Sequence, residues 1–357
     1  MPEQSPDEDL NEAVRSRYIP LLEPLFFPND PISHDIVRYF SSLLRVVGAE
    51  DKGWDPYEES RGIIDDLYAL MRSEYVTENA PGKELVRWRL GLLFYCHIVE
   101  MDAPYEVFAN LLRFRLGKGY SPNPFFEYLT PKEQKRAQKV GLFPVKKIEI
   151  IKHLCAEAGL QSASIFDEFY RPALRNAINH SDFIFTDEGF RCRGGHGATG
   201  FKISYDELND ILTKAKVFIG TFFGLETEAR RFWGTFAGKG LPYDPIYKGI
   251  MEVLVDADGL LNGFKVHWPN RSESFYRRTK SGIDMTNCFL DFDAGNLQMM
   301  VGLYARRAGT FSPLVEADAL PTYTRLEGSS DELRWDAEAA AHRYRPPSNM
   351  PGDAPTS

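Results

Sequence analysis

The segment Arg175-Asn176-Ala177-Ile178-Asn179-His180 brings a fixed cation, an amide and an imidazole together within six residues. An imidazole suits proton transfer, because a histidine ordinarily titrates at about pH 6.5. A guanidinium suits a phosphate group, because its planar fork stays charged and can bind two oxygens. An amide can orient the imidazole or donate to the phosphate. The segment therefore has the residue types of a reaction centre.

The elements around the segment decide whether these groups can act together. The sequence predicts one continuous helix that ends near residue 181. At about 100° per residue, Arg175 and His180 lie about 140° apart, whereas Asn176 and His180 lie one turn apart and can touch. Arg175 and His180 can serve one site only if the helix bends or a second chain contributes, so the spacing favours a dimer. The opposite, mostly apolar stripe consists of Phe166, Tyr170, Leu174, Ala177, Ile178 and Ser181.

A non-catalytic interpretation explains the same residues. An arginine and a histidine on the outer face of a helix are typical of a solvated face, and they could also stabilise a dimer through hydrogen bonds. Asn179, Ser181 and Asp182 are either supporting groups of a site or caps of the helix end. Both interpretations stay open at the level of the sequence.

The segment resembles the signature of the HEPN superfamily, in which an Arg is followed directly by a polar residue and, after four to six residues, by a His. Arg175, Asn176 and His180 match this pattern, with four residues between Arg and His. The resemblance covers a helical region of roughly 90–235 and leaves both ends of the chain unexplained. It implies a metal-independent endoribonuclease of toxin or phage-defence type, whose partners would be an RNA substrate and an antitoxin or regulatory protein.

The resemblance also implies the roles of the residues. His180 would be the general acid or base, Arg175 would bind the phosphate, and Asn176 would support them. The family's sites are formed by two copies in a dimer cleft, so two His180 side chains would supply the acid and the base. No metal and no cofactor is expected. The alternative function is a non-catalytic HEPN-like helical module that binds nucleotide, RNA or a protein partner.

The charge distribution predicts two places for RNA. The net charge of −9 argues against a protein that grips nucleic acid with its whole surface. Residues 131–152, however, carry seven cationic against two acidic side chains, and Arg271 and Lys280 flank a second basic segment with Phe275 and Tyr276. A solvated charged face is the alternative for each. The expected RNA-binding residues are Lys132, Lys135, Arg136, Lys139, Lys146, Lys147, Arg277 and Arg278.

Composition predicts a cytoplasmic protein with ordinary cores. The acidic N-terminus lacks the basic and apolar regions of a signal peptide, and the most apolar window, residues 90–99, is too short to span a membrane. The four cysteines form no CxxC pair, which indicates buried or free thiols in a reducing compartment rather than a zinc site.

The order of the sequence patterns predicts a mainly α protein. We expect a disordered acidic lead over 1–15 and a HEPN-like helical bundle over 16–238, with a small β-hairpin insertion after the motif. A small α+β or β-rich domain is expected over 239–315, where short apolar runs alternate with Gly, Asp and Asn, and a largely disordered tail over 316–357.

Overall fold

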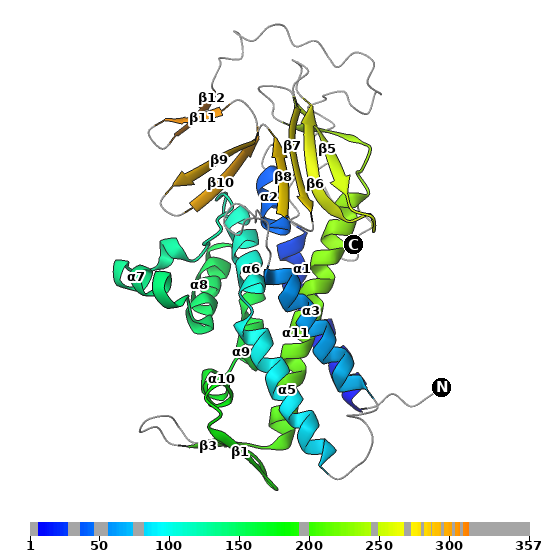
Figure 1. Cartoon of the computed structure of the whole chain (residues 1–357), viewed down its shortest axis with the longest axis vertical. Coiled ribbons are helices and arrows are strands. Elements are labelled where there is room, and N and C mark those ends of the chain that lie inside the picture. Colours follow the sequence, from blue (N-terminus) through cyan, green and yellow to red (C-terminus); the bar gives the residue numbers. More distant parts are fainter. Residues whose placement is uncertain are drawn as a thin grey trace, which may run out of the picture. The chain divides into compact units, whose positions relative to one another are not determined.

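The computed structural model of the chain is mainly helical, with small antiparallel sheets (Figure 1). This confirms the predicted mainly α class with a β component. The described residues are 6–27, 36–45, 56–73, 82–192, 200–243, 249–267, 273–279, 282–286, 288–293, 296–301, 304–307 and 310–313. The predicted tail, 316–357, lies outside them.

The chain divides into two compact units, each assembled from three segments. The first unit comprises residues 1–23, 56–108 and 127–224, and the second comprises residues 24–55, 109–126 and 225–357. The helices are α1 (Pro6–Phe26), α2 (Ile36–Leu44), α3 (Pro56–Arg72), α5 (Lys83–Glu100), α6 (Asp102–Arg115), α7 (Pro131–Val140), α8 (Pro144–Glu157), α9 (Ile165–Phe169), α10 (Pro172–Asn179) and α11 (Tyr205–Gly234), with 3-10 turns at Phe126–Tyr128 and Ser162–Ser164. Within the described residues, no helix is both long and apolar enough to cross a membrane.

Local signals in the sequence set the limits of several helices. The spacing of Thr130 and Glu133 predicts a capping box, and the two residues form one at the start of α7, with Pro131 in its first turn. Pro144 likewise occupies the first turn of α8. Helix α11 follows Ser204, whose hydroxyl accepts a hydrogen bond from the Glu207 N–H at 3.1 Å. These signals and the apolar periodicity predict helices over 131–140, 145–159 and 205–233, and the structure confirms each within a few residues.

Helix α1 begins at Pro6, inside the segment that the sequence predicts to be disordered. Val14, Tyr18 and Leu22 recur every four residues and are buried at 2%, 0% and 0% exposure. This buried stripe holds the helix in place. The prediction of disorder rested on the acidic composition of this segment and did not take the buried stripe into account.

The motif helix is broken, which corrects the prediction of one continuous helix to residue 181. Helix α9 ends at Phe169 and α10 begins at Pro172. Proline has no N–H to donate to the preceding turn and disfavours helical geometry at the residue before it, and Arg171 accordingly has φ −123° and ψ 100°. The break turns α10 away from α9, so the predicted angles between side chains around the helix axis apply only within α10.

Aromatic side chains form the core of the first unit. The ring of Phe166 is 1% exposed and lies 5.7 Å from the rings of Tyr105 and Phe108 and 5.3 Å from that of Phe218. Helices α6, α9 and α11 thus meet around a single ring. Because α10 follows α9 after only two residues, this core also fixes where the motif begins.

The strands are antiparallel throughout the described sheets. After α10 the chain enters the predicted hairpin of β1 (Phe183–Thr186) and β2 (Gly189–Cys192), extended by β3 (Phe201–Ile203) (Figure 1). The second unit holds the expected β-rich region. Its strands are β4 (Gly240–Tyr243), β5 (Gly249–Val255), β6 (Leu261–His267), β7 (Glu273–Thr279) and β8 (Gly282–Thr286) in one sheet, with the pairs β9 (Cys288–Asp293) and β10 (Asn296–Val301), and β11 (Tyr304–Arg307) and β12 (Thr310–Pro313).

Replacing Phe166 with alanine should lower the free energy of unfolding by about 3–5 kcal/mol, because it leaves a cavity where three helices meet. Urea denaturation followed by circular dichroism measures the change. Leu93, which is 57% exposed on α5, is the control, and Leu93→Ala should change stability by less than about 0.5 kcal/mol. Equal losses in both variants would contradict the assigned core.

The capping box of α7 should persist well below the ordinary titration range of a glutamate. Hydrogen bonds from the Thr130 backbone and hydroxyl lower the pKa of Glu133 to about 2 from about 4.5. Since the folded pKa is the lower one, the contribution is complete above about pH 4.5 and is lost as the pH falls through about 2. A carboxyl NMR titration of Glu133 tests this. Thr130→Val should raise the titration midpoint and Thr130→Ser should not, whereas a midpoint near 4.5 in the unaltered chain would refute the box.

Candidate functional site

The polar residues of the motif share the outer side of α10. Leu174, Ala177 and Ile178 are buried at 0%, 5% and 8% exposure, while Asn176 and Asn179 are exposed. His180 is also exposed, at the cap that follows the helix. The structure therefore places the motif as the sequence predicts within α10, with its apolar side packed and its polar side accessible.

The end of α10 is closed by backbone hydrogen bonds around Ser181. The Ser181 N–H donates to the Ile178 carbonyl at 3.0 Å, and the Asp182 N–H donates to the Ala177 carbonyl at 2.9 Å. Ser181 has φ 52°, the left-handed conformation that closes a helix in this way and that a non-glycine residue adopts at a cost of about 1 kcal/mol. The backbone N–H groups of Ser181 and Asp182 thus close the helix end, which is one of the two roles that the sequence leaves open for these residues.

Arg175 is held by Glu100, the last residue of α5. The two side chains form an ion pair through Arg175 Nε, with the arginine side chain 17% and the glutamate 35% exposed. Asn179 Nδ2 also donates to Glu100, at 3.3 Å, and Arg175 Nη1 donates to Asn176 Oδ1 at 2.9 Å. The hydrogen bond to Glu100 raises the pKa of Arg175. One carboxylate thus orients two motif residues.

Sequence reasoning did not identify Glu100 as a site residue. It lies 75 positions before Arg175, near the end of residues 87–101, whose largely apolar sequence predicts a helix in the core. That contrast was the available signal. A carboxylate at the negative end of a helix is stabilised by a nearby cation.

His180 keeps both ring nitrogens available. The imidazole makes no hydrogen bond to any described residue, and only its backbone N–H is engaged, with the Asn176 carbonyl at 3.0 Å. Within the described residues the Asn176 side chain contacts Arg175 rather than the ring. The predicted Asn176–His180 side-chain contact is therefore replaced by an Asn176–Arg175 contact.

The basic segment separates into buried and exposed cations. Lys147 is 4% exposed and pairs with Asp102, so it serves the fold rather than a surface. Lys146 lies 3.3 Å from carboxylate oxygens of both Glu133 and Glu149. The cations of α7, which contributes no buried residue, are exposed, and they are Lys132, Lys135, Arg136 and Lys139.

Phe143 connects the exposed cations to the motif. Its ring is 42% exposed, with the Arg136 guanidinium carbon 5.2 Å and the Arg175 guanidinium carbon 5.9 Å from the ring centroid. An exposed ring flanked by two arginines offers a base a stacking surface and its phosphate a cation. Phe143 was not predicted from the sequence.

The second basic patch is partly internal to the second unit. Tyr276 is fully buried, and Arg278 donates to the Leu44 carbonyl, with burial lowering the pKa of its guanidinium to about 10. Arg277 remains exposed, while Arg271 and Lys280 lie outside the described residues. The aromatic and cationic groups predicted to bind RNA here are therefore not all at the surface.

Other nucleophiles and imidazoles of the first unit are occupied or buried. Burial raises the pKa of the Cys96 thiol to about 12 and that of Cys155 to about 11, which leaves both protonated and inert. His97 Nε2 lies 3.0 Å from the Ser60 carbonyl, and His153 pairs with Glu157 at 3.4 Å. His196 lies outside the described residues. His180 is thus the unengaged imidazole among the described residues of this unit.

The exposed face of α10 therefore combines an oriented arginine, two amides and an available imidazole with a nearby aromatic and basic surface. Among the described residues, no group of three or more His, Cys, Asp and Glu side chains is arranged to hold a metal ion. Comparisons with protein-family models, curated proteins and solved structures gave no match to this chain.

Proposed function

We propose that the chain is a metal-independent endoribonuclease that acts in the cytoplasm in a toxin or phage-defence role. The observation that carries the proposal is the exposed face of α10, where Arg175, Asn176, Asn179 and His180 lie together and Phe143 links Arg175 to the basic helix α7. The resemblance of Arg175-Asn176-x-x-x-His180 to the HEPN signature supports the same reaction.

The cleavage step uses groups that this face supplies. A base takes the proton of the ribose 2′-OH, the oxygen attacks the adjacent phosphorus, and the bond to the 5′-oxygen breaks as an acid protonates it. The products are a 2′,3′-cyclic phosphate and a 5′-hydroxyl. His180 can be base or acid because both ring nitrogens are available, and Arg175 neutralises charge that develops on the phosphate.

The site is completed by a second copy of the chain. One base and one acid are needed, and the other described imidazoles of the first unit, on His97 and His153, are engaged elsewhere. Large apolar side chains are exposed around Arg175's neighbour Phe143, with Val140 62% and Val145 42% exposed. Burial of the Val140 and Val145 side chains between two copies would stabilise a dimer, and a dimer that brings two His180 side chains to one phosphate would supply both the base and the acid.

Glu100 prepares Arg175 for the phosphate. The ion pair and the Asn176 contact hold the guanidinium in one orientation before RNA arrives, which lowers the entropy lost on binding. Among the described residues, none accepts a hydrogen bond from Arg175 Nη2, so this nitrogen remains available for a phosphate oxygen. The carboxylate also reduces the local positive charge, so affinity depends on the additional cations of α7.

Alanine at His180 should lower RNA cleavage by about 10²–10⁴-fold, because the proton-transfer group is removed. Arg175→Ala should lower it comparably. Cleavage of total RNA by the purified protein in the presence of EDTA is the measurement, with a cyclic phosphate expected on the products and no cleavage of DNA. His153→Ala, which removes an exposed imidazole on α8, is the control and should retain activity.

Retained cleavage in both His180→Ala and Arg175→Ala, or loss of cleavage with EDTA, would overturn this mechanism. Sedimentation velocity on the same samples addresses the second copy. An active species that sediments as a monomer would refute the composite site while leaving the roles of His180 and Arg175 in place.

A second candidate function is a non-catalytic HEPN-like module that binds RNA, nucleotide or a protein partner. The Arg175–Glu100 pair favours it, because a neutralised arginine is also what a purely structural contact between α5 and α10 would require.

Glu100→Gln tests whether Arg175 binds phosphate or only joins α5 to α10. The amide oxygen of Gln can still accept from Arg175, but the negative charge is gone, so a phosphate-binding arginine should bind single-stranded RNA roughly two- to fivefold more tightly. Fluorescence anisotropy with a labelled oligoribonucleotide measures the affinity. Glu149→Gln, at an exposed glutamate of α8, controls for the change in overall charge. Equal affinities of the two variants would favour the structural role.

A further inference from the structure

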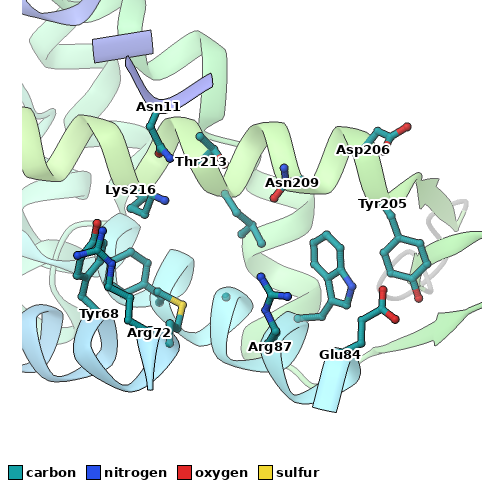
Figure 2. Close-up of a pocket in the computed structure, with 15 residues that line it drawn as sticks. Asn11, Tyr68, Arg72, Glu84, Arg87, Tyr205, Asp206, Asn209, Thr213 and Lys216 are labelled. Carbon is teal, nitrogen blue, oxygen red and sulfur yellow. The ribbon is translucent and has the colours of Figure 1, made fainter. Parts of the chain in front are cut away.

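The first unit contains a cavity of about 560 Å³ that the motif does not use. It is lined by side chains of α3, α5 and α11, with Asn11 contributed by α1 (Figure 2). Its volume lies within the range of about 300–1,000 Å³ that small-molecule sites occupy. The floor is formed where α5 approaches α11 at Gly91, since a Cβ there would lie only 3.0 Å from Leu212 Cδ1.

Three helices each bring a cation to this cavity. Arg72 comes from α3, Arg87 from α5 and Lys216 from α11, and Figure 2 shows them around the same space. The Arg72 guanidinium carbon lies 4.6 Å from the centroid of the Tyr68 ring, which orients it. Neither Arg72 nor Arg87 forms an ion pair with any described carboxylate. Arg72 and Arg87 therefore repel one another across the cavity, and a bound anion would relieve this repulsion.

The rest of the cavity has a different chemistry. Glu84 lies one turn before Arg87 on α5, and its carboxylate points toward Tyr205 rather than toward the cations (Figure 2). Trp88 packs on Tyr205 with ring centroids 5.0 Å apart, and Asn209 adds an amide from α11. This part of the cavity can accept hydrogen bonds from hydroxyl or amino groups and cover an apolar ligand surface.

We propose that this cavity binds a small phosphate ester. The phosphate lies among Arg72, Arg87 and Lys216, and the end of the ligand that bears hydroxyl or amino groups lies against Glu84 and Trp88. Three cations from separate helices suit the several oxygens of one phosphate, and the carboxylate on the adjoining wall selects a ligand that also donates hydrogen bonds. The inference does not depend on ribonuclease activity, because it concerns other residues and is tested without RNA.

Isothermal titration calorimetry of the full chain tests the site with four probes: inorganic phosphate, ribose 5-phosphate, adenosine 5′-monophosphate and adenosine. We expect both phosphate esters to bind more tightly than inorganic phosphate and adenosine to bind weakest. Binding of ribose 5-phosphate as tight as that of the nucleotide would assign a sugar phosphate, and tighter binding of the nucleotide would assign a nucleoside phosphate. Adenosine binding as tight as its monophosphate, or no binding of any phosphate probe, would overturn the proposal.

Arg87→Gln should weaken binding of the phosphate esters roughly tenfold or more, because a charge-assisted hydrogen bond is lost. Arg89→Gln is the matched control, since Arg89 lies two residues further along α5, is exposed and does not line the cavity. Arg72→Gln removes the cation that α3 contributes and gives an independent test of the same site. Equal weakening in Arg87→Gln and Arg89→Gln would show a general charge effect and refute the site.

Glu84→Gln tests the other end of the ligand. The variant should bind inorganic phosphate as tightly as before or more tightly, because a repelling charge is removed, yet bind the preferred ester several-fold more weakly. Tighter binding of both probes would show that Glu84 only repels anions and would refute its contact with the ligand.

Discussion

Pro172 sets the geometry of the motif because it cannot donate a backbone hydrogen bond to the turn before it. The resulting break leaves polar backbone groups inside the first unit, and Tyr95 of α5 satisfies two of them. Its hydroxyl accepts from the Arg171 N–H at 3.1 Å and donates to the Phe169 carbonyl at 3.2 Å. Burial raises the pKa of Tyr95, so the hydroxyl keeps the proton that it donates. The direction of α10 depends on this one buried group.

Helix α5 therefore fixes the motif at two points. Tyr95 holds the start of α10, and Glu100, five residues further on, holds Arg175 within it. Tyr95 and Val99 are fully buried, which makes α5 a rigid support. The arginine is consequently fixed before any ligand binds, whereas His180 lies beyond the last residue of the helix with its ring unengaged. The two groups differ in freedom because one is tied to the core and the other is not.

Local signals predicted the elements, and contacts between distant segments decided the site. The capping box at Thr130 and the turn before Gly189 lie within a few residues, so α7 and the β1–β2 hairpin could be predicted. The hydrophobic periodicity continues across Pro172 and therefore predicted one helix where the structure has two, although the proline itself is a signal for a helix break. The Glu100–Arg175 pair and the burial of Lys147 against Asp102 depend on tertiary packing, which no spacing in the sequence encodes.

The basic segment shows how one run of charge serves two purposes. Lys147 is buried and paired, so its loss would leave Asp102 without its partner at the start of α6. Helix α7, in contrast, contributes no buried residue, and its cations can contact an anion without disturbing the core. Since the chain as a whole is acidic at −9, these exposed cations form a local attraction within a repelling surface. If the proposed function holds, these cations would attract RNA toward Phe143 and Arg175, and a higher salt concentration would weaken this attraction before it destabilises the folded core.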